Sequence, residues 1–341
     1  MQNRIAMTSD RPFEFETVRP SVDEIDQCRY SAWSKFFREH IFPSIIINPL
    51  PTAFIDYLLS DTIKLPRSHQ PIIASSDNEY SDWESEEDDV QDDVTTGFAS
   101  MHDRVVAAIR ELGPVFPKMN WSAPKDAKWM LPNNVLQCHD ASDVYLVLNA
   151  SSHIVHDMEH TYEETGSGKQ PDNFELVLRQ WTQMNPALEF RVFVFRRCII
   201  GVCQRDPNYY DYLANLEPQL RLQIDQFFAT VFLPSEITLE NCVLDVYLPR
   251  PFDKTWLVDI NPFSRATDPL LFTWNELLSE SRDGSRDIYE FRLLHENNIH
   301  RNAAKDHSEN QVPLDVIGAA NDTEAMVELA RAWNQNDISA P

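Results

Sequence analysis

Glycine is scarce in this chain, and its scarcity limits the folds and phosphate sites that the chain can form. The 341 residues include seven glycines, far below an average usage of about 7%. Walker loops, the glycine-rich loops of kinases and the turns of dinucleotide-binding folds all need clustered glycines. The cluster Gly166-Ser167-Gly168-Lys169 lacks the Walker spacing, and Pro171 stands where a helix would begin. We therefore interpret 166–169 as a surface loop, and any nucleotide must be held by side chains and strand backbone.

Acidic charge and cysteine usage narrow the class of protein further. The net charge of −25 argues against binding to the anionic backbone of a nucleic acid. Five cysteines, without a CxxC pair, indicate reduced thiols in the cytosol or nucleus. No apolar run approaches the ~20 residues of a membrane span, and the first residues lack the apolar core of a signal peptide. We expect a cytoplasmic protein without a membrane segment or direct nucleic-acid contacts.

The distribution of charge and hydrophobicity divides the chain into five parts. Residues 75–96 contain ten Asp or Glu and no Lys or Arg, which is typical of a solvated, disordered insertion. The apolar spacing at 321–334 allows one last amphipathic helix. The predicted parts are an irregular extension (1–27), a segment packing on the core (28–72), the acidic insertion (73–97), a two-lobed core (98–280) and a loose C-terminal segment (281–341).

Hydrophobic periodicity predicts an α+β fold. Apolar residues at helical spacing predict helices at 98–112, 140–150, 208–232 and 268–279. Apolar runs between turn residues predict strands at 115–118 and 174–181, and hairpins at 189–206 and 243–263. Residues 152–173 are expected to form a loop. We therefore predict antiparallel sheets with flanking helices.

The hairpin at 243–263 carries an aspartate in each of its apolar strands. A carboxylate between apolar neighbours costs several kcal/mol to bury unless something compensates its charge. Residues i and i+2 share one face of a strand, so Asp259 and Asn261 lie side by side. If Asp245 pairs opposite them, the three residues form an all-oxygen site suited to Mg²⁺. A buried aspartate that caps a loop or pairs with an arginine fits the pattern equally well.

Basic residues in other strand-like segments complement these carboxylates. Lys118, Arg179 and Arg191 could neutralise phosphates while Mg²⁺ bridges them, which is the common way to hold ATP. The strand backbone beside Trp181 could bind the edge of an adenine, and the indole could cover its face. Ordinary alternatives exist, since a strand-end lysine is usually solvated and Arg191 could pair with Glu189.

Histidines offer a second possible metal site. His153, His156 and His160 lie close in sequence, with Asp157 and Glu159 nearby. No helix is predicted for this segment to align the imidazoles, so a solvated surface is favoured over a metal site.

Six motifs resemble those of the eukaryotic cell division cycle protein 123 family, which are ATP-grasp-related assembly factors for translation initiation factor 2. The combination of FPKxNWSAP and DxNPF is highly specific, and the resemblance runs in order from about Cys28 to Leu278. The motifs are SAWSKFF (31–37), VFPKMNWSAPKDA (115–127), FELVLRQW (174–181), EFRVFV (189–194), GVCQRDPNYYD (201–211) and TWLVDINPFSRATDPLLFTWNEL (255–277).

The resemblance implies an ATP-grasp-like two-lobed fold with ATP between the lobes. Mg²⁺ would be bound by Asp245, Asp259 and Asn261. Family members bind the gamma subunit of initiation factor 2 and promote its assembly with the alpha and beta subunits. The implied ATP-binding residues are Lys118, Asn120, Ala123, Lys125, Arg179, Trp181, Arg191 and Arg205.

Three functions are compatible with these residues. The leading hypothesis is an ATP- and Mg²⁺-binding assembly chaperone for initiation factor 2. An ATP-grasp ligase, which would form an acyl-phosphate and transfer it to an amine, is the alternative, but no residue outside the nucleotide set suggests an acid-substrate pocket. A scaffold with an inactive site is the third, and we expect its buried charges to be unpaired without a ligand.

Overall fold

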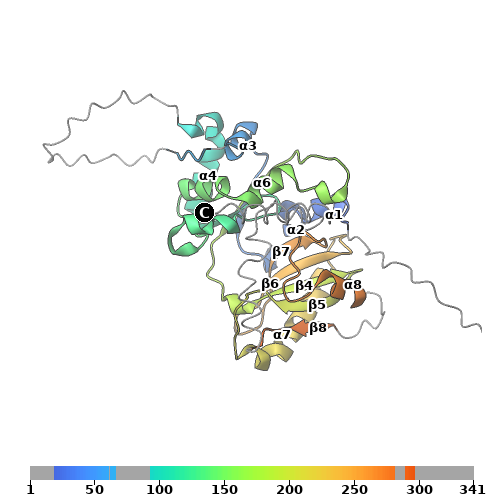
Figure 1. Cartoon of the computed structure of the whole chain (residues 1–341). Coiled ribbons are helices and arrows are strands. Elements are labelled where there is room, and N and C mark those ends of the chain that lie inside the picture. The colour runs from blue at the N-terminus through green and yellow to red at the C-terminus, as the bar shows by residue number, and fades with distance from the viewer. Residues whose placement is uncertain (1–18, 61, 67–92, 281–288, 296–341) are drawn as a thin grey trace, which may run out of the picture.

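The computed structural model describes residues 19–60, 62–66, 93–280 and 289–295, which form two lobes (Figure 1). Each lobe is built on one sheet. The small-lobe sheet has three antiparallel strands in the order β1-β3-β2, and the large-lobe sheet has five strands in the order β7-β6-β4-β5-β8. The predicted α+β fold is therefore confirmed.

The small lobe packs helices against its three-stranded sheet. Helix α4 (Ala99–Leu112) was expected from its apolar spacing, and Gly113 ends it with a φ of +77°, a conformation that side chains disfavour. Helix α5 follows Asp140, whose carboxylate accepts a hydrogen bond from the Asp143 amide. The other elements of the lobe are β1 (Ser44–Ile47), α3 (Thr52–Leu58), β2 (Val115–Lys118), α5 (Ala141–Asn149), α6 (Ser152–Glu159) and β3 (Leu176–Gln180).

The large lobe contains both predicted hairpins. Strands β4 (Glu189–Phe195) and β5 (Cys198–Gln204) are joined by Arg196 and Arg197, which both have positive φ. Strands β6 (Cys242–Tyr247) and β7 (Trp256–Pro262) form the second hairpin. One face of the sheet packs on α7 (Leu213–Phe227) and the π-helical turn η7 (Phe228–Phe232), and the other packs near α8 (Trp274–Glu280).

Successive side chains of β4 point alternately to the two faces of the large-lobe sheet. Phe190, Val192 and Val194 point into the main core with α7, whereas Phe193 belongs to the cluster on the α8 side. Arg191 lies on the face opposite to the main core. Short helices complete the fold: α1 (Val22–Gln27), α2 (Tyr30–Ser34), η1 (Arg38–His40), η2 (Val94–Phe98), η3 (Lys125–Met130), η4 (Pro132–Asn134), η5 (Glu163–Thr165) and η6 (Pro186–Leu188).

Several elements differ from the predictions. The segment expected to be irregular up to residue 27 ends in helix α1, which Ser21 and Glu24 stabilise by a reciprocal capping box. The expected loop 152–173 begins with α6, whose N-terminus is capped by Ser151. Both helices have a capping signal in the sequence but are too short for apolar periodicity to identify them.

The C-terminal side of the core also differs. Helix α8 begins at Trp274 rather than at Asp268, because Asp268 accepts a hydrogen bond from the Leu270 amide and Leu270 has a φ of +55°. In the segment expected to be loose, β8 (Glu290–Arg292) adds a parallel strand beside β5, so the sheet is mixed rather than purely antiparallel. The predicted helix at 321–334 and residues 67–92 of the acidic insertion lie outside the described residues.

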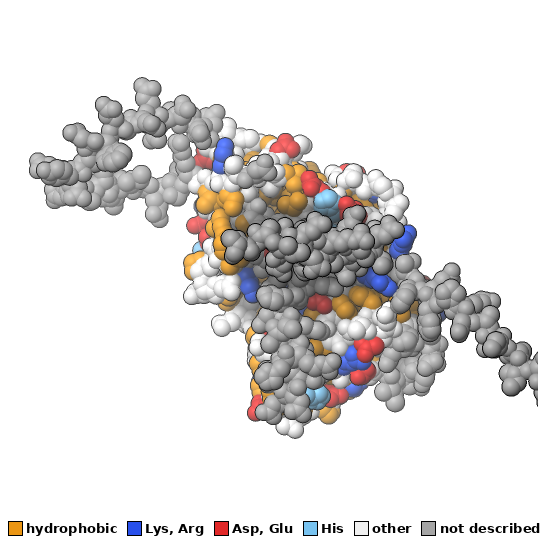
Figure 2. All heavy atoms as spheres, viewed as in Figure 1, with side chains coloured by type: hydrophobic (Ala, Val, Ile, Leu, Met, Phe, Trp, Pro, Cys, Tyr) orange, Lys and Arg blue, Asp and Glu red, His pale blue; other side chains and the backbone are white. Residues whose placement is uncertain are grey.

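Figure 2 shows one face of the surface, where hydrophobic side chains gather along one flank and acidic and basic side chains are interspersed elsewhere. Of the large hydrophobic residues that the structure describes, Trp129 is the most exposed, at 69%. Among the described residues, no helix combines the length and the hydrophobicity needed to cross a membrane.

All five cysteines are free and four are buried, as expected for reduced thiols. The Gly166–Lys169 segment is an exposed loop, as predicted.

Candidate functional site

A cavity of about 260 Å³ lies between the two lobes. Its walls come from β2 and β3 of the small lobe, from η3 and the segment after η4, and from β4, β6 and β7 of the large lobe. Residues far apart in the sequence therefore meet at one place. Of the predicted site residues, eight line this cavity: Lys118, Ala123, Lys125, Arg179, Trp181, Arg205, Asp245 and Asp259.

Three predicted site residues do not line the cavity. Asn120 is fully buried and holds the backbone before β3, where its amide donates to Asn173 O (2.7 Å) and accepts from Glu175 N (2.8 Å). Arg191 is buried behind Asp245, and Asn261 donates to Asp245 Oδ2 at 3.4 Å. These three side chains hydrogen-bond to the backbone or to Asp245 and so help to hold the residues that line the cavity.

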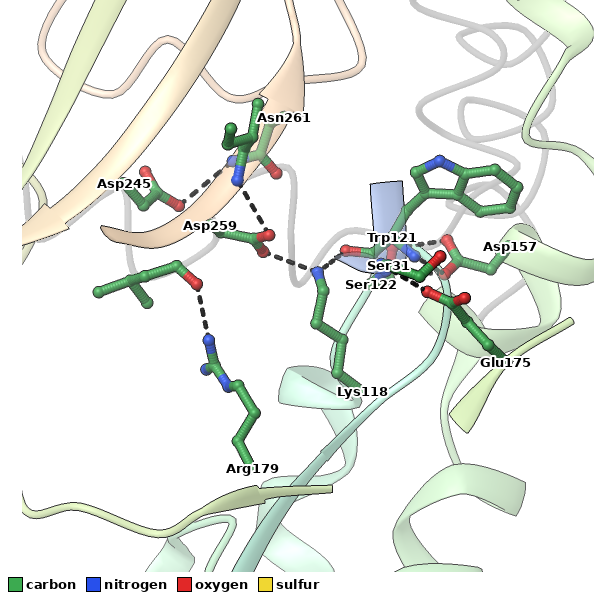
Figure 3. Close-up of polar contacts among 12 residues, drawn as sticks. Ser31, Lys118, Trp121, Ser122, Asp157, Glu175, Arg179, Asp245, Asp259 and Asn261 are labelled. Atoms are coloured by element: carbon green, nitrogen blue, oxygen red, sulfur yellow. Dashed lines mark hydrogen bonds and ion pairs between the residues drawn. The ribbon is translucent and has the colours of Figure 1, made fainter. Parts of the chain in front are cut away.

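Lys118 and Asp259 connect the lobes at the polar end of the cavity (Figure 3). Lys118 ends β2 with only 1% of its side chain exposed, and its Nζ lies 2.8 Å from Asp259 Oδ2. Nζ also donates to Trp121 O. The second oxygen of Asp259 accepts from the Ile260 amide at 3.0 Å, so both carboxylate oxygens are already engaged by the protein.

Asp245 lies directly opposite Asp259 across β6 and β7. Arg191 binds it with a two-pronged contact, Nε to Oδ1 at 2.8 Å and Nη2 to Oδ2 at 2.9 Å, and Arg205 Nε lies 3.4 Å from Oδ2. Burial acts to raise the pKa of Asp245, but the charges of Arg191 and Arg205 outweigh it and hold the pKa well below its usual range. Asp245 therefore stays ionised.

The expectation that the buried aspartates would be unpaired without a ligand is wrong. Asp259 pairs with Lys118, and Asp245 pairs with Arg191. The alternative pairing of Arg191 with Glu189 is also wrong, because Arg205 takes Glu189, with Nη1 to Oε2 at 3.0 Å. Strand register explains the difference: Arg191 faces Asp245 directly across β4 and β6.

The cavity nevertheless retains buried cationic donors. Arg179 donates from Nη1 to Val258 O at 2.6 Å and stacks over Phe116 at 4.8 Å. The Nε atom of Arg179 is buried and has no hydrogen-bond partner within the described part of the chain, whereas Arg205 Nε faces Asp245 Oδ2 at 3.4 Å. Since buried donors normally find an acceptor, Arg179 Nε fits a cavity that receives an anionic ligand.

One wall of the cavity is apolar, and most of it could not be recognised from the sequence. It comes from separate segments, and each contributes only one or two side chains, so no local motif marks it. Beside Trp181, the apolar lining residues are Phe42, Phe116, Ala123, Val135, Leu136, Met184 and Val258. Such a wall suits the face of a planar base.

The strand backbone at this wall is partly occupied. The amide of Gln180 donates to Pro43 O and the amide of Trp181 donates to Pro114 O, both at 2.8 Å. These two amides are therefore not free to bind the edge of a base in this conformation.

Lys125 stands at the mouth of the cavity on η3, with part of its side chain exposed to solvent. Desolvation by the walls lowers the pKa of Lys125 to about 7, and the positive charge of Arg205 acts in the same direction, while Asp245 and Asp259 oppose it. Solvent at the mouth of the cavity makes this lowering of the Lys125 pKa smaller. Lys125 can therefore change its charge near neutral pH.

Asp245 and Asp259 are the lining carboxylates that face each other across two strands and could bind a divalent cation. The cavity is also lined by Glu189, which pairs with Arg205. Mg²⁺ typically takes one or two carboxylates and completes its shell with phosphate oxygens and water, so two aspartates beside basic residues fit it. The histidines do not form a comparable site. His153 pairs with Asp126 (3.4 Å) and His160 with Glu163 (2.6 Å), and no group of three or more His, Cys, Asp or Glu among the described residues could hold a metal.

Comparisons with known proteins agree on one family. The model of the D123 family matches residues 33–320. Cell division cycle protein 123 from Candida glabrata is 47% identical over 330 residues, which cover 92% of each chain. The translation initiation factor eIF2 assembly protein from Candida albicans is 45% identical and covers 94% of this chain and 96% of its own. The solved structure of Cdc123 from Schizosaccharomyces pombe superposes with a TM-score of 0.68 at 30% identity, covering 82% of this chain and all of that one.

Proposed function

This chain belongs to the D123 family, and from that premise we propose that it is an ATP- and Mg²⁺-binding assembly factor for translation initiation factor eIF2 that acts by binding the gamma subunit. The names of relatives support the assembly role, since one that is 45% identical is called a translation initiation factor eIF2 assembly protein. Such a role belongs in the cytoplasm. The nucleotide part of the proposal rests on the interlobe cavity.

The observation that carries the nucleotide proposal is that this cavity is lined by both aromatic and basic side chains. Its apolar side chains, with Phe116 and Trp181, would hold the base, and its basic side chains, Lys118, Lys125 and Arg205, would neutralise the phosphates. Asp245 and Asp259 would hold Mg²⁺, which would screen the phosphate charge. Because Lys118 now binds Asp259, we propose that Lys118 moves its contact from that carboxylate to a phosphate oxygen.

Ligand-dependent thermal stability tests the nucleotide proposal. A ligand that binds only the folded state adds RT ln(1+[L]/Kd), about 2.7 kcal/mol at a hundredfold excess over Kd. We expect millimolar Mg·ATP to raise the unfolding temperature of the wild type, and Asp259→Asn to abolish that increase. Asp253→Asn is the matched control, because Asp253 lies exposed at the turn of the same hairpin and should keep the full increase.

Two outcomes would contradict parts of the proposal. The ATP proposal fails if Mg·ATP produces no shift in the wild type. Rapid turnover of ATP with a small acid and an amine would favour the ligase over the assembly factor.

A pull-down tests the partner. The wild-type chain should recover the gamma subunit of eIF2 from a mixture of the purified subunits, and Asp259→Asn measured beside Asp253→Asn shows whether the nucleotide site contributes. Failure of the wild type to retain the gamma subunit would overturn the assembly proposal without affecting the nucleotide proposal.

Lys125 predicts a pH dependence of ATP binding. Desolvation lowers its pKa in the free protein, so the neutral form becomes more populated as pH rises above 7, and a triphosphate beside it should raise that pKa. Binding would then take up a proton, and the affinity should fall as pH rises above 7, at most about tenfold per pH unit for one proton. Titration calorimetry in buffers with different ionisation enthalpies measures the uptake.

Lys125→Arg is the control for this pH dependence, because arginine stays charged throughout the range. Its ATP affinity should be nearly independent of pH between 7 and 9, as set by the Lys125 pKa of about 7 and by the absence of arginine titration. Equal slopes for wild type and variant would show that another group takes up the proton.

A further inference from the structure

We propose that Asp157, on α6, is a positioning residue that fixes the Lys118 ammonium group through the Trp121–Ser122 peptide. This inference rests on the proposed function, because it concerns how Lys118 is held ready for a phosphate. Asp157 does not line the cavity, and its segment was expected to be a loop. The argument depends on one peptide group whose two ends contact different side chains.

The carbonyl end of that peptide holds Lys118. Lys118 Nζ is buried and has two contacts, Trp121 O and Asp259 Oδ2 (Figure 3). The contact with Asp259 crosses between the lobes, whereas Trp121 belongs to the turn that directly follows β2. If Lys118 releases Asp259 to contact a ligand, Trp121 O is the acceptor that keeps the ammonium group in place.

The amide end of the same peptide is held by Asp157. Ser122 N donates to Asp157 Oδ2 at 2.7 Å, Trp121 N donates to the same oxygen at 3.2 Å, and Ser122 Oγ donates to Asp157 Oδ1 at 2.7 Å. In a planar trans peptide the N–H and the C=O point in opposite directions. By binding the Ser122 N–H, Asp157 therefore turns the Trp121 C=O toward Lys118.

Asp157 is suited to hold this peptide because it is buried and lies on a helix. Only 2% of its surface is exposed, so water competes little for its carboxylate oxygens, and α6 fixes its backbone. A carboxylate accepts several hydrogen bonds at once, and here it takes three from two consecutive residues. Residues that do not touch a ligand often orient, through hydrogen bonds, the group that does, and Asp157 has this relation to Lys118.

Other contacts hold the rest of the turn independently of Asp157. Asn120 bonds to the backbone at Asn173 and Glu175, and the Trp121 indole donates to Ile25 O at 2.8 Å. The turn should therefore keep its overall path when Asp157 changes, while the orientation of one peptide becomes free. This separation makes the proposal testable.

The test compares ligands with and without phosphates. Asp157→Asn keeps the size of the side chain but places an amide donor against backbone N–H donors. We expect its Kd for Mg·ATP to rise roughly tenfold, in the range typical for loss of an orienting residue, while its Kd for adenosine stays unchanged. Calorimetry or competition binding on the full chain gives both constants, and urea unfolding gives the stability separately.

Glu159→Gln is the matched control, because it makes the same acid-to-amide change at an exposed position of α6, where Glu159 lies 3.6 Å from His160. It should leave the ratio of the two Kd values unchanged. If Asp157→Asn does not fold, Ser122→Ala removes only the hydroxyl contact with Asp157, and we expect the same change in the ratio at a smaller size.

A double variant separates positioning from general structural support. In a Lys118→Met background, Asp157→Asn should cause no further loss of Mg·ATP affinity, because the residue acts only through Lys118. Additive losses, or an equal loss of adenosine and Mg·ATP binding, would overturn the positioning role. Absence of any Mg·ATP binding in the wild type would instead overturn the proposed function, and this inference with it.

Discussion

Arg191→Met should lower the free energy of unfolding by about 3–5 kcal/mol, the usual result of removing one partner of a buried ion pair. Arg191 and Asp245 are both buried and share two short hydrogen bonds, and Arg191 also donates to Asp268 O at 2.5 Å. Without Arg191, Asp245 keeps the longer contacts with Arg205 and Asn261, both at 3.4 Å. Urea denaturation at neutral pH measures the loss.

Two further variants test whether the loss of stability comes from burial of the unpaired Asp245 charge. Lys169→Met removes the same charge from an exposed pair with Asp26, in which the side chains are 40% and 33% exposed, and should cost no more than about 1 kcal/mol. Adding Asp245→Asn to Arg191→Met should recover part of the loss, because no lone charge remains buried. A cost for Arg191→Met as small as that for Lys169→Met would contradict the prediction.

The loss should also depend on pH. In the wild type, the pKa of Asp245 lies below its value in the unfolded chain, so its pairing stabilises the fold above an unfolded pKa of about 3.9 and the contribution is lost as pH falls through the folded pKa. In Arg191→Met the folded pKa rises and the carboxyl can bind a proton. The difference between the two proteins should therefore be largest at neutral pH and shrink toward acid.

Lys118→Met should weaken ATP binding and at the same time create binding of a free divalent cation. A hydrogen bond to a charged group contributes about 1.5–3 kcal/mol, so loss of the proposed phosphate contact should raise the Kd for Mg·ATP by roughly 10- to 100-fold. Removing the ammonium group also releases Asp259 Oδ2, which it now binds at 2.8 Å. Mn²⁺ without nucleotide should then raise the unfolding temperature of the variant but not of the wild type.

The control for this pair of effects is Lys128→Met, since Lys128 lines the same cavity from an exposed position. It removes the same charge without releasing Asp259, so it should weaken ATP binding less and leave Mn²⁺ without effect. The exchange of partners at Asp259 would be refuted if wild type and Lys118→Met responded alike to Mn²⁺.

Elements with strong local signals could be predicted from the sequence. The helical spacing of apolar residues at 98–112 predicted α4, and the apolar runs at 189–206 predicted the hairpin that contains β4. Short elements that depend on distant partners were missed. Strand β8 has three residues and owes its conformation to pairing with β5, and α6 is recognisable only by its cap at Ser151.

In the candidate site, too, residues with a local signal could be predicted and those that depend on distant partners could not. Lys118, Asp245 and Asp259 could be proposed because charged residues in apolar strands are conspicuous, and the structure brings them to one cavity. Their pairing could not be predicted, since it depends on the register between strands that lie more than fifty residues apart, as Arg191 and Asp245 do. The apolar wall was missed because residues such as Phe42 and Met184 look like ordinary core residues until the lobes are assembled.

Because the cavity is formed by both lobes, anything bound in it acts as a removable cross-link between them. A ligand that touches Arg179 on one side and Asp245 on the other favours the lobe arrangement that fits it. A partner protein that contacts both lobes would favour one arrangement in the same way. Thermodynamic reciprocity then requires that nucleotide and partner change each other's affinity by the same factor, so bound ATP could control the lifetime of a complex without being consumed.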